Sequence, residues 1–248
     1  MSKTYFITGA NRGLGLGLVT TLLQQPNTTI IATVRSPSAA EALQTTISPL
    51  PRPETTVLHI LPLDLTAVPN DLPSKLSASL SDLGITQINT LICNAGHIAP
   101  LTPATQTTAP DLRASFETNT IAPLLTFQAC FPLMQKVEEP KFVLVSSSVG
   151  SIAAQEPVPG GAYGPSKAAA NWLVRALHVQ NEGLIALALH PGWVRTRAGE
   201  FSATEWGVST PPLVGVQESV RGMLGVIGAA GREQSGRFVT YTGEVLEW

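Results

Sequence analysis

Residues 4–15 read Thr-Tyr-Phe-Ile-Thr-Gly-Ala-Asn-Arg-Gly-Leu-Gly, and this stretch decides the fold. Its beginning is apolar and β-branched and predicts a strand, while an apolar segment of helical period follows it. The glycines between strand and helix allow a sharp turn and let the backbone approach a pyrophosphate closely. The free N–H groups and the positive dipole end of the helix would then face the phosphates. The spacing Gly-x-x-x-Gly-x-Gly therefore predicts a dinucleotide-binding loop.

The same loop excludes one nucleotide class and leaves one alternative open. It lacks the Lys-Ser/Thr ending of loops that bind nucleoside triphosphates, so hydrolysis of ATP or GTP is disfavoured. A tight strand–helix turn that binds no ligand would show the same glycine spacing, and the loop by itself does not separate the two.

Beyond this loop, apolar runs alternate with amphipathic segments along the whole chain. Strands are predicted at 4–8, 28–34, 56–61, 88–93, 141–146, 184–189 and 237–241, and helices at 14–25, 38–48, 70–83, 110–135, 163–181 and 215–229. Several of the strands are apolar on both faces, as a parallel sheet covered by helices requires. The chain therefore predicts an α/β fold. With no repeat and no low-complexity linker, residues 1–248 are expected to form a single domain.

Composition narrows the range of partners. Hydrophobic residues make up 44% of the 248 residues and charged ones 13%, which excludes a disordered, highly charged tail protein. The net charge is −2 and no basic run occurs, so neither nucleic acid nor a membrane surface is expected as a partner. No apolar stretch is long enough for a signal peptide or a membrane span, so we expect a soluble, cytoplasmic protein.

Cysteine and histidine placement argues against a redox centre or a metal site. Cys93 and Cys130 each lie in an apolar run and are expected to be buried free thiols. His59, His178 and His190 have no partners at metal-ligand spacing, so no metal is expected.

Three irregular stretches are longer than simple connections need to be. Residues 97–110, 148–162 and 191–214 all follow predicted strands. Ligands of open α/β sheets bind at the C-terminal ends of the strands, and long loops in compact domains are usually functional. We therefore expect these loops to surround a ligand site.

Charge near the second strand indicates the type of dinucleotide. This strand ends Thr-Val-Arg-Ser at residues 33–36, and the next acidic residue is Glu41. NAD sites place a carboxylate there, whereas NADP sites need cations for the additional phosphate. Arg35 and Arg12, which lies in the glycine loop, could clamp that phosphate with two guanidinium groups. The sequence therefore favours NADP(H).

A candidate acid–base pair opens the helix predicted at 163–181. Tyr163 and Lys167 are four residues apart and so lie on one helix face. A free phenol titrates near about pH 10, and a nearby ammonium favours the phenolate and lowers that pKa. An exposed i,i+4 pair without a catalytic role is the alternative for this motif alone.

Serines follow the strand predicted at 141–146, at residues 146–148. A serine at the end of a strand can donate a hydrogen bond to a substrate carbonyl oxygen as charge develops there. Ordinary turn chemistry would also place serine at these positions.

These motifs together resemble the short-chain dehydrogenase/reductase family, in its single-domain branch. The resemblance extends over nearly the whole chain and rests on motifs in the family's order: Thr8–Gly15, Asp64-Leu65, Asn94-Ala95-Gly96, Asn119, Ser147, Tyr163-x-x-x-Lys167 and Pro191-Gly192. The segment His190–Val194 and the ending Gly236–Trp248 resemble C-factor-like carbonyl reductases and fungal norsolorinic acid ketoreductases. The resemblance implies a Rossmann-type doubly wound sheet of about seven strands in the order 3-2-1-4-5-6-7, with helices on both faces.

The resemblance also implies roles for the site residues. Tyr163 would protonate the carbonyl oxygen, and Lys167 would lower the pKa of that tyrosine and hold the nicotinamide ribose. Ser147 would orient the substrate, with Ser148 as the alternative, and Asn119 would support a water-linked proton relay. Residues implied to bind NADP(H) are Gly9, Asn11, Arg12, Gly13, Leu14, Gly15, Arg35, Asp64, Leu65, Asn94, Ala95, Gly96, Tyr163, Lys167, Pro191, Gly192, Val194 and Thr196.

Two departures concern the substrate pocket. Ser147 and Tyr163 are 16 residues apart (163 − 147), a longer spacing than is common in this branch. His97 occupies a position that is often apolar, where it could contact substrate or simply be solvated. Phe201 and Trp206 in the expected substrate loop, 195–214, either contact substrate or pack against the protein.

The expected function is hydride transfer from NADPH to the ketone or aldehyde of an apolar, aromatic or polyketide-like small molecule, typical of secondary metabolism. Alternatives are non-redox chemistry on the same fold (dehydration, epimerisation or cyclisation) and NADPH sensing without turnover. Relatives form homodimers or homotetramers through helices like those predicted at 110–135 and 163–181, and some are monomers.

Overall fold

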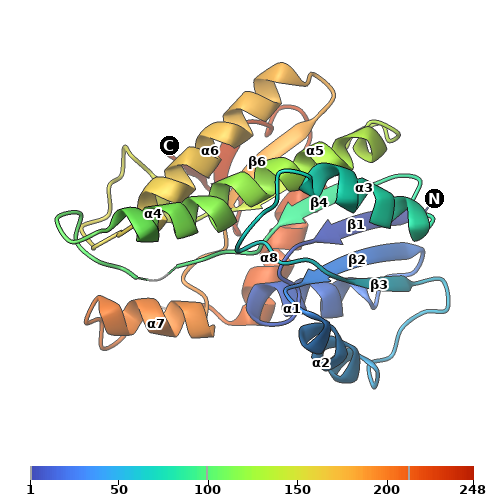
Figure 1. Ribbon diagram of the computed structural model, residues 1–248, viewed down its shortest axis with the longest axis horizontal. Coiled ribbons are helices and arrows are strands. Elements are labelled where there is room, and N and C mark those ends of the chain that lie inside the picture. The colour runs from blue at the N-terminus through green and yellow to red at the C-terminus, as the bar shows by residue number, and fades with distance from the viewer. Residues whose placement is uncertain (1, 99, 212) are drawn as a thin grey trace.

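The computed structural model describes residues 2–98, 100–211 and 213–248, which form one eight-stranded sheet in the order β3-β2-β1-β4-β5-β6-β7-β8 (Figure 1). The strands are β1 (Lys3–Ile7), β2 (Thr28–Val34), β3 (Val57–Pro62), β4 (Thr90–Cys93), β5 (Lys141–Val145), β6 (Ile185–His190), β7 (Arg237–Thr240) and β8 (Val245–Leu246). All neighbours pair in parallel except β7 and β8. The structure thus confirms the predicted α/β fold and strand order and adds a short antiparallel edge strand.

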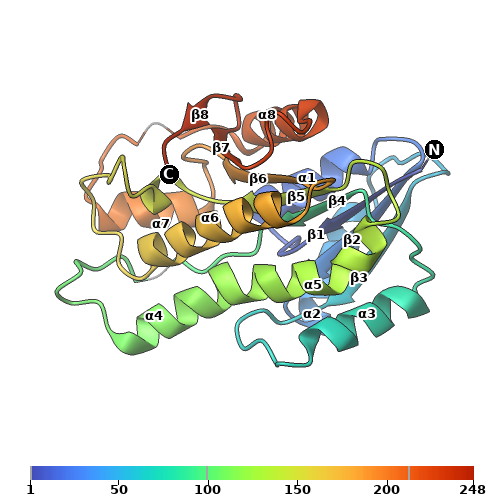
Figure 2. The same cartoon turned by 90° about the horizontal axis from the view of Figure 1, so that it is seen from above.

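Helices cover both faces of this sheet (Figures 1 and 2). The α-helices are α1 (Gly13–Leu22), α2 (Pro37–Ile47), α3 (Leu72–Asp82), α4 (Ala109–Phe116), α5 (Ala122–Met134), α6 (Tyr163–Gln180), α7 (Arg197–Glu205) and α8 (Val216–Ala229). One face carries α3, α5 and α6, and the other carries α1, α2 and α8. None of the helices in the described part of the chain is long and apolar enough to span a membrane.

The core consists of two apolar layers, one on each side of the sheet. On the α5 side the ring of Phe127 meets that of Phe142 edge to face at 5.4 Å between centroids. On the other face Leu18 of α1 and Val220 of α8 are fully buried, because these two helices pack on each other and on the strands. Strands that are apolar on both faces, which the sequence shows, are therefore required by the fold.

The parallel register brings several strand ends to one edge of the sheet. Ile7 pairs with Ile92, Cys93 with Leu144, and Val145 with Leu189. The loops that follow β1, β4, β5 and β6 therefore start beside one another. Both views place α4 and α7 at this end of the molecule, away from the N-terminus (Figures 1 and 2).

Two predicted segments differ from the structure. The helix predicted at 110–135 is interrupted by a π-helical turn, Glu117–Ile121, which joins α4 to α5. The stretch 191–214, predicted to be irregular, contains α7, whose N-terminus is capped by the Thr196 hydroxyl accepting a hydrogen bond from the Gly199 N–H at 3.2 Å. A π-turn is a rare single-turn insertion in an otherwise α-helical segment, so the apolar pattern of 110–135 predicts one continuous helix.

Candidate active site

The loop after β1 is held against the segment after β4. Thr8 Oγ1 accepts hydrogen bonds from the backbone N–H groups of Asn94 and Ala95, both at 3.0 Å. Asn94 Nδ2 in turn donates to the carbonyl oxygens of Thr8 and Gly9 at 3.0 and 3.1 Å. Side-chain and backbone bonds together fix the shape of the turn.

Glycine is required at two points of this loop. Gly9 has φ +67°, and a Cβ there would lie 2.9 Å from the Ala95 Cα. A Cβ on Gly15 would overlap the Gly9 carbonyl oxygen. The loop is therefore a tightly closed cradle of backbone at the start of α1, as the glycine spacing predicts for a pyrophosphate site.

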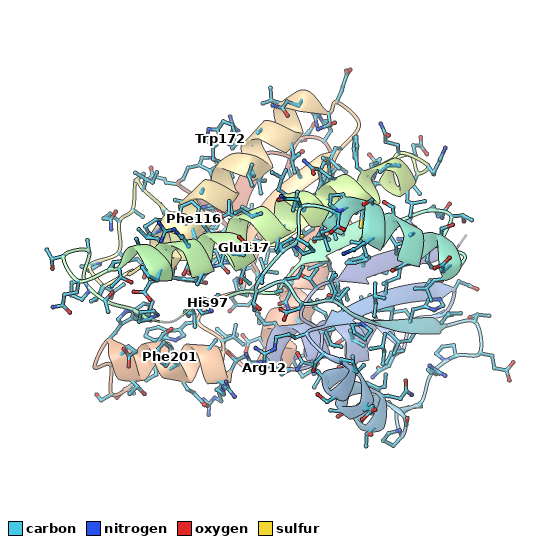
Figure 3. The ribbon with its side chains drawn as sticks, in the orientation of Figure 1. Arg12, His97, Phe116, Glu117, Trp172 and Phe201 are labelled. Atoms are coloured by element: carbon cyan, nitrogen blue, oxygen red, sulfur yellow. The ribbon has the colours of Figure 1, made fainter. Side chains whose placement is uncertain are left out.

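The N-terminus of α1 begins in this cradle and has no side-chain cap. Arg12 is its N-cap residue and provides no side-chain cap, so no N-cap side chain uses the first-turn N–H groups. The Arg12 side chain is exposed at the beginning of the helix (Figure 3). The free N–H groups, the helix dipole and a guanidinium all favour an anion at this place.

Arg35 lies at the C-terminal end of β2, next to the loop after β3. The pKa of Asp64 in that loop is lowered, first by hydrogen bonds from the Thr66 side chain and backbone N–H, and further by the charge of Arg35. Arg35 is exposed, and Leu65 is buried beneath the loop. The structure thus brings Arg35 and Asp64, both of which the family resemblance implies to bind NADP(H), into the same region.

Tyr163 and Lys167 lie on one face of the first turns of α6. Lys167 is almost fully buried, and its Nζ lies 5.6 Å from the centroid of the Tyr163 ring. The Nζ atom donates a hydrogen bond of 2.7 Å to the carbonyl oxygen of Val145. The expected pair is therefore not an exposed surface pair but is built into the end of β5.

Burial shifts the pKa values of both groups, and the tyrosine differs from expectation. Desolvation lowers the pKa of Lys167 to about 8. Desolvation raises the pKa of Tyr163 to about 12, while a side-chain hydrogen bond with Ser147 lowers it and the charge of Glu156 raises it. The lowering of the Tyr163 pKa by Lys167 stays a prediction: burial of the phenol is the largest cause of the shift, and the charge of Lys167 is not among its causes.

The three serines after β5 have different surroundings. The Ser146 hydroxyl is buried and donates to Asn171 Oδ1 at 2.6 Å. Ser147 interacts with the phenol of Tyr163 and also caps the short 3₁₀ turn Ser148–Gly150. The geometry therefore favours Ser147 over Ser148, the choice that the sequence leaves open.

His190 supports the serine turn and was not predicted as part of the site. Its Nδ1 accepts a hydrogen bond from the Ser148 backbone N–H at 3.3 Å. Burial lowers the pKa of His190 to about 4, so the ring is neutral at physiological pH and can accept this bond. In the sequence, the one signal for such a role of His190 is its place as a polar residue at the end of an otherwise apolar strand.

Asn119 is fully buried in the π-helical turn and holds the segment after β4. Its Oδ1 accepts from the His97 backbone N–H at 2.8 Å, and its Nδ2 donates to the His97 carbonyl at 2.8 Å. Nδ2 also donates to the Ser166 hydroxyl at 2.9 Å. The amide of Asn119 thus holds both the segment after β4 and the start of α6, and within the described residues no hydrogen bond joins Asn119 to Lys167.

The segment after β6 lies beside the glycine loop. Gly192 has φ +81°, where a Cβ would lie 2.9 Å from the Tyr241 ring. The Pro191 carbonyl accepts a 2.6 Å hydrogen bond from the buried Ser219 hydroxyl. A Cβ on Gly13 would be 3.4 Å from the Thr196 Cγ2, so the first and last parts of the expected dinucleotide site meet here. Val194 is buried next to them.

Trp206 attaches α7 to the loop before Tyr163. Its Nε1 donates to the Pro159 carbonyl at 3.0 Å, and its ring packs edge to face on Trp193 at 5.6 Å between centroids. Of the two readings of Trp206, packing against the protein is the one the structure supports. Phe201 is half-buried on α7, and His97 lies between α4 and α7 (Figure 3).

No group of three or more His, Cys, Asp or Glu able to hold a metal ion occurs within 2–98, 100–211 and 213–248.

The chain matches known proteins over its full length. The profile of the family described as "short chain dehydrogenase" matches residues 3–205. "Short chain dehydrogenase gsfK" of Penicillium aethiopicum is 36% identical over 257 residues, covering 100% of both chains. "Norsolorinic acid ketoreductase stcE" of Emericella nidulans is 34% identical over 250 residues, covering 98% of this chain and 93% of the relative.

A solved structure has the same overall fold. The NADPH-bound carbonyl reductase from chicken fatty liver superimposes with a TM-score of 0.85 at 34% identity, covering 100% of this chain and 99% of the other. Together with the order of the motifs and the geometry of the site, these matches establish that this chain belongs to the short-chain dehydrogenase family.

Proposed function

We propose that this protein is an NADPH-dependent reductase of ketone or aldehyde carbonyls, acting on apolar, aromatic or polyketide-like small molecules. The observation that carries the proposal is the cluster of Ser147, Tyr163 and Lys167 at the strand edge where the glycine loop also opens. A phenol, a hydroxyl and a buried ammonium converge there, beside a backbone cradle shaped for a pyrophosphate.

The residues present fit the adenosine and phosphate parts of NADPH. Side chains cannot occupy the cradle formed by Gly9 and Gly15, and the first N–H groups of α1 have no side-chain cap. Arg12 and Arg35 would hold the additional phosphate, because no carboxylate follows β2 before Glu41. The loop Asp64-Leu65 would border the adenine, and Val194 and Thr196 would border the nicotinamide.

A bound NADPH supplies the hydride that the carbonyl carbon accepts. In our proposal the Ser147 hydroxyl donates a hydrogen bond to the carbonyl oxygen and stabilises the charge that develops there. Tyr163 then transfers its phenolic proton to that oxygen. A pKa of about 12 keeps this phenol protonated at neutral pH, which suits the reduction direction.

Lys167 and Asn119 act by position and charge. The Lys167 ammonium, fixed to the Val145 carbonyl, would stabilise the phenolate left after proton transfer. Asn119 would keep the His97 segment at the edge of the pocket. The proposal includes a water-linked proton relay at Asn119, since its Oδ1 can accept a second hydrogen bond.

The substrate class rests on the aromatic residues of α7 and of the segments beside it. Half-buried Phe201 and the aromatic pair Trp193–Trp206 lie on the α7 side. Relatives include norsolorinic acid ketoreductases, which supports an aromatic, polyketide-like ketone. We expect the protein to act in the cytoplasm, as a homodimer or homotetramer, in secondary metabolism.

The test is consumption of NADPH with a panel of small aliphatic and bulky aromatic ketones, followed by identification of the products. Equal formation of NADP⁺ and alcohol, faster for the aromatic ketones, supports the proposal. Product formation without NADPH consumption would indicate non-redox chemistry, and binding without any turnover would indicate an NADPH sensor.

A further inference from the structure

The π-helical turn that carries Asn119 is tied to the loop that follows β3. The Oε1 atom of Glu117 accepts a hydrogen bond from the backbone N–H of Val68 at 2.7 Å, across 49 residues of sequence. Glu117 is half-buried and is the first residue of the π-helical turn between α4 and α5 (Figure 3).

Apolar packing joins the same two segments. Leu65, Leu72 and Ala122 form a small buried cluster. Val68 and Ala95 pack against it, so the loop after β3, the start of α5 and the Asn94–Gly96 segment are in contact. Apolar packing alone does not fix the orientation of the loop. The Glu117 hydrogen bond does so, because it holds the Val68 N–H in one place relative to the π-turn.

The geometry of Glu117 suits a positioning role. A carboxylate that accepts from a backbone N–H makes a charge-assisted bond, stronger than one between neutral groups. The one ion pair within the described residues joins Lys75 to Asp71, so Glu117 has no cationic partner that competes for its oxygen. Its backbone carbonyl meanwhile accepts the Ala122 N–H that closes the π-turn.

We propose that Glu117 is a positioning residue that holds the loop 64–68 in place for the adenine half of the dinucleotide and joins that loop to the turn carrying Asn119. The inference rests on the proposed NADPH site, because Asp64 and Leu65 border an adenine only if NADPH binds as proposed. Loss of the Glu117 oxygen would release Val68 and let this loop move. The adenine half would then bind a less ordered surface.

The test is calorimetric titration of the full chain with adenosine 2′,5′-bisphosphate, which represents the adenine half and requires no turnover. Glu117→Ala should weaken this binding about five- to tenfold, whereas Glu117→Gln, which keeps an acceptor oxygen, should stay within about twofold of the original chain. Glu138→Ala, an exposed glutamate between α5 and β5, is the matched control and should leave binding unchanged.

Kinetics give a second readout with the nicotinamide half. In Glu117→Ala, KM for NADPH should rise with kcat unchanged, while KM for reduced nicotinamide mononucleotide, which lacks adenine, should stay the same. If Glu117→Ala fails to fold, Glu117→Asp, one methylene too short to reach Val68, replaces it in both measurements.

Three results would overturn the inference. The first is unchanged bisphosphate binding in Glu117→Ala, and the second is equal weakening in Glu117→Gln, because either would show that the acceptor oxygen is not what matters. The third is failure of the unaltered chain to bind the bisphosphate, which would also remove the proposed NADPH site. The first two results leave the proposed function intact.

Discussion

The ammonium of Lys167 is bound to the backbone carbonyl of Val145, the last residue of β5, at 2.7 Å. The same strand end leads directly into the serine turn, so one strand positions the lysine and the candidate hydrogen-bond donor to the substrate. Lys167 is therefore anchored by the sheet and not by Tyr163, whose ring centroid lies 5.6 Å away. The proposed catalytic groups share a rigid support.

The buried charge of Lys167 should cost stability. Burial lowers the pKa of Lys167 from 10.5 to about 8. Between these pH values the unfolded chain binds more protons at Lys167 than the folded chain does. The contribution of Lys167 to the free energy of unfolding therefore rises with pH. Lys167→Met should therefore increase the free energy of unfolding at pH 7 by about 1–3 kcal/mol, with the lost bond to Val145 reducing the gain.

This advantage should shrink as the pH rises from about 8 toward 10.5. Urea unfolding of both chains at several pH values measures it, with the exposed Lys75→Met as control. A difference between the two chains that does not change with pH would contradict the placement of a buried, charged lysine at this position.

The two neighbouring serines provide a test of the substrate contact. Ser147→Ala should lower kcat by about 10²-fold, because the hydroxyl next to Tyr163 would no longer stabilise charge on the carbonyl oxygen. Ser148→Ala should leave kcat nearly unchanged, since the structure uses the Ser148 backbone N–H, bound to His190. Steady-state rates with one aromatic ketone decide the matter, and the reverse order of effects would assign the role to Ser148.

Arg35 should determine the choice between NADPH and NADH. Arg35 lies at the end of β2, and its charge acts on Asp64 in the loop after β3. Removal of its charged hydrogen bond to the phosphate should cost about 1.5–3 kcal/mol of the free energy of NADPH binding. Arg35→Ala should change NADH binding far less. Titration of both dinucleotides measures this, with the exposed Arg52→Ala as control. Similar losses for both dinucleotides would argue against NADPH specificity.

Trp206 should keep α7 against the pocket. Trp206→Phe keeps a ring beside Trp193 but removes the N–H that binds the Pro159 carbonyl. KM for bulky aromatic ketones should rise about three- to tenfold, because the loss of one hydrogen bond loosens the pocket wall. Trp172→Phe, on an indole that is 67% exposed, is the control. Unchanged KM values in Trp206→Phe would show that this bond does not shape the pocket.

The α/β class and the positions of the site motifs could be predicted from local patterns, whereas the strand order was implied by the family resemblance. Gly9 is required by its positive φ and Gly15 by its contact with the Gly9 carbonyl oxygen, both within one turn, and Tyr163 and Lys167 are related by helix geometry alone. Apolar runs such as β2 and β6 report burial on both faces directly. These features depend on neighbours in sequence, which the sequence shows.

Features that depend on distant contacts could not be predicted. The pKa of Tyr163 is raised by burial, and this burial arises only when the loops around the site are in place. Helix α7 has a capping Thr196 but a glycine in its first turn and a weak apolar face, so its propensity was too low to identify it. The tie between Glu117 and Val68 joins residues 49 positions apart.

The central claim is that Tyr163 protonates a carbonyl that receives hydride from NADPH. Its most direct test uses NADPH deuterated at the transferring position of C4, an aromatic ketone and mass spectrometry of the product. The unaltered chain should form an alcohol with one deuterium on the carbinol carbon, and Tyr163→Phe should form it about 10²–10⁴-fold more slowly while binding NADPH equally well. An alcohol without deuterium, or undiminished turnover by Tyr163→Phe, would contradict the account.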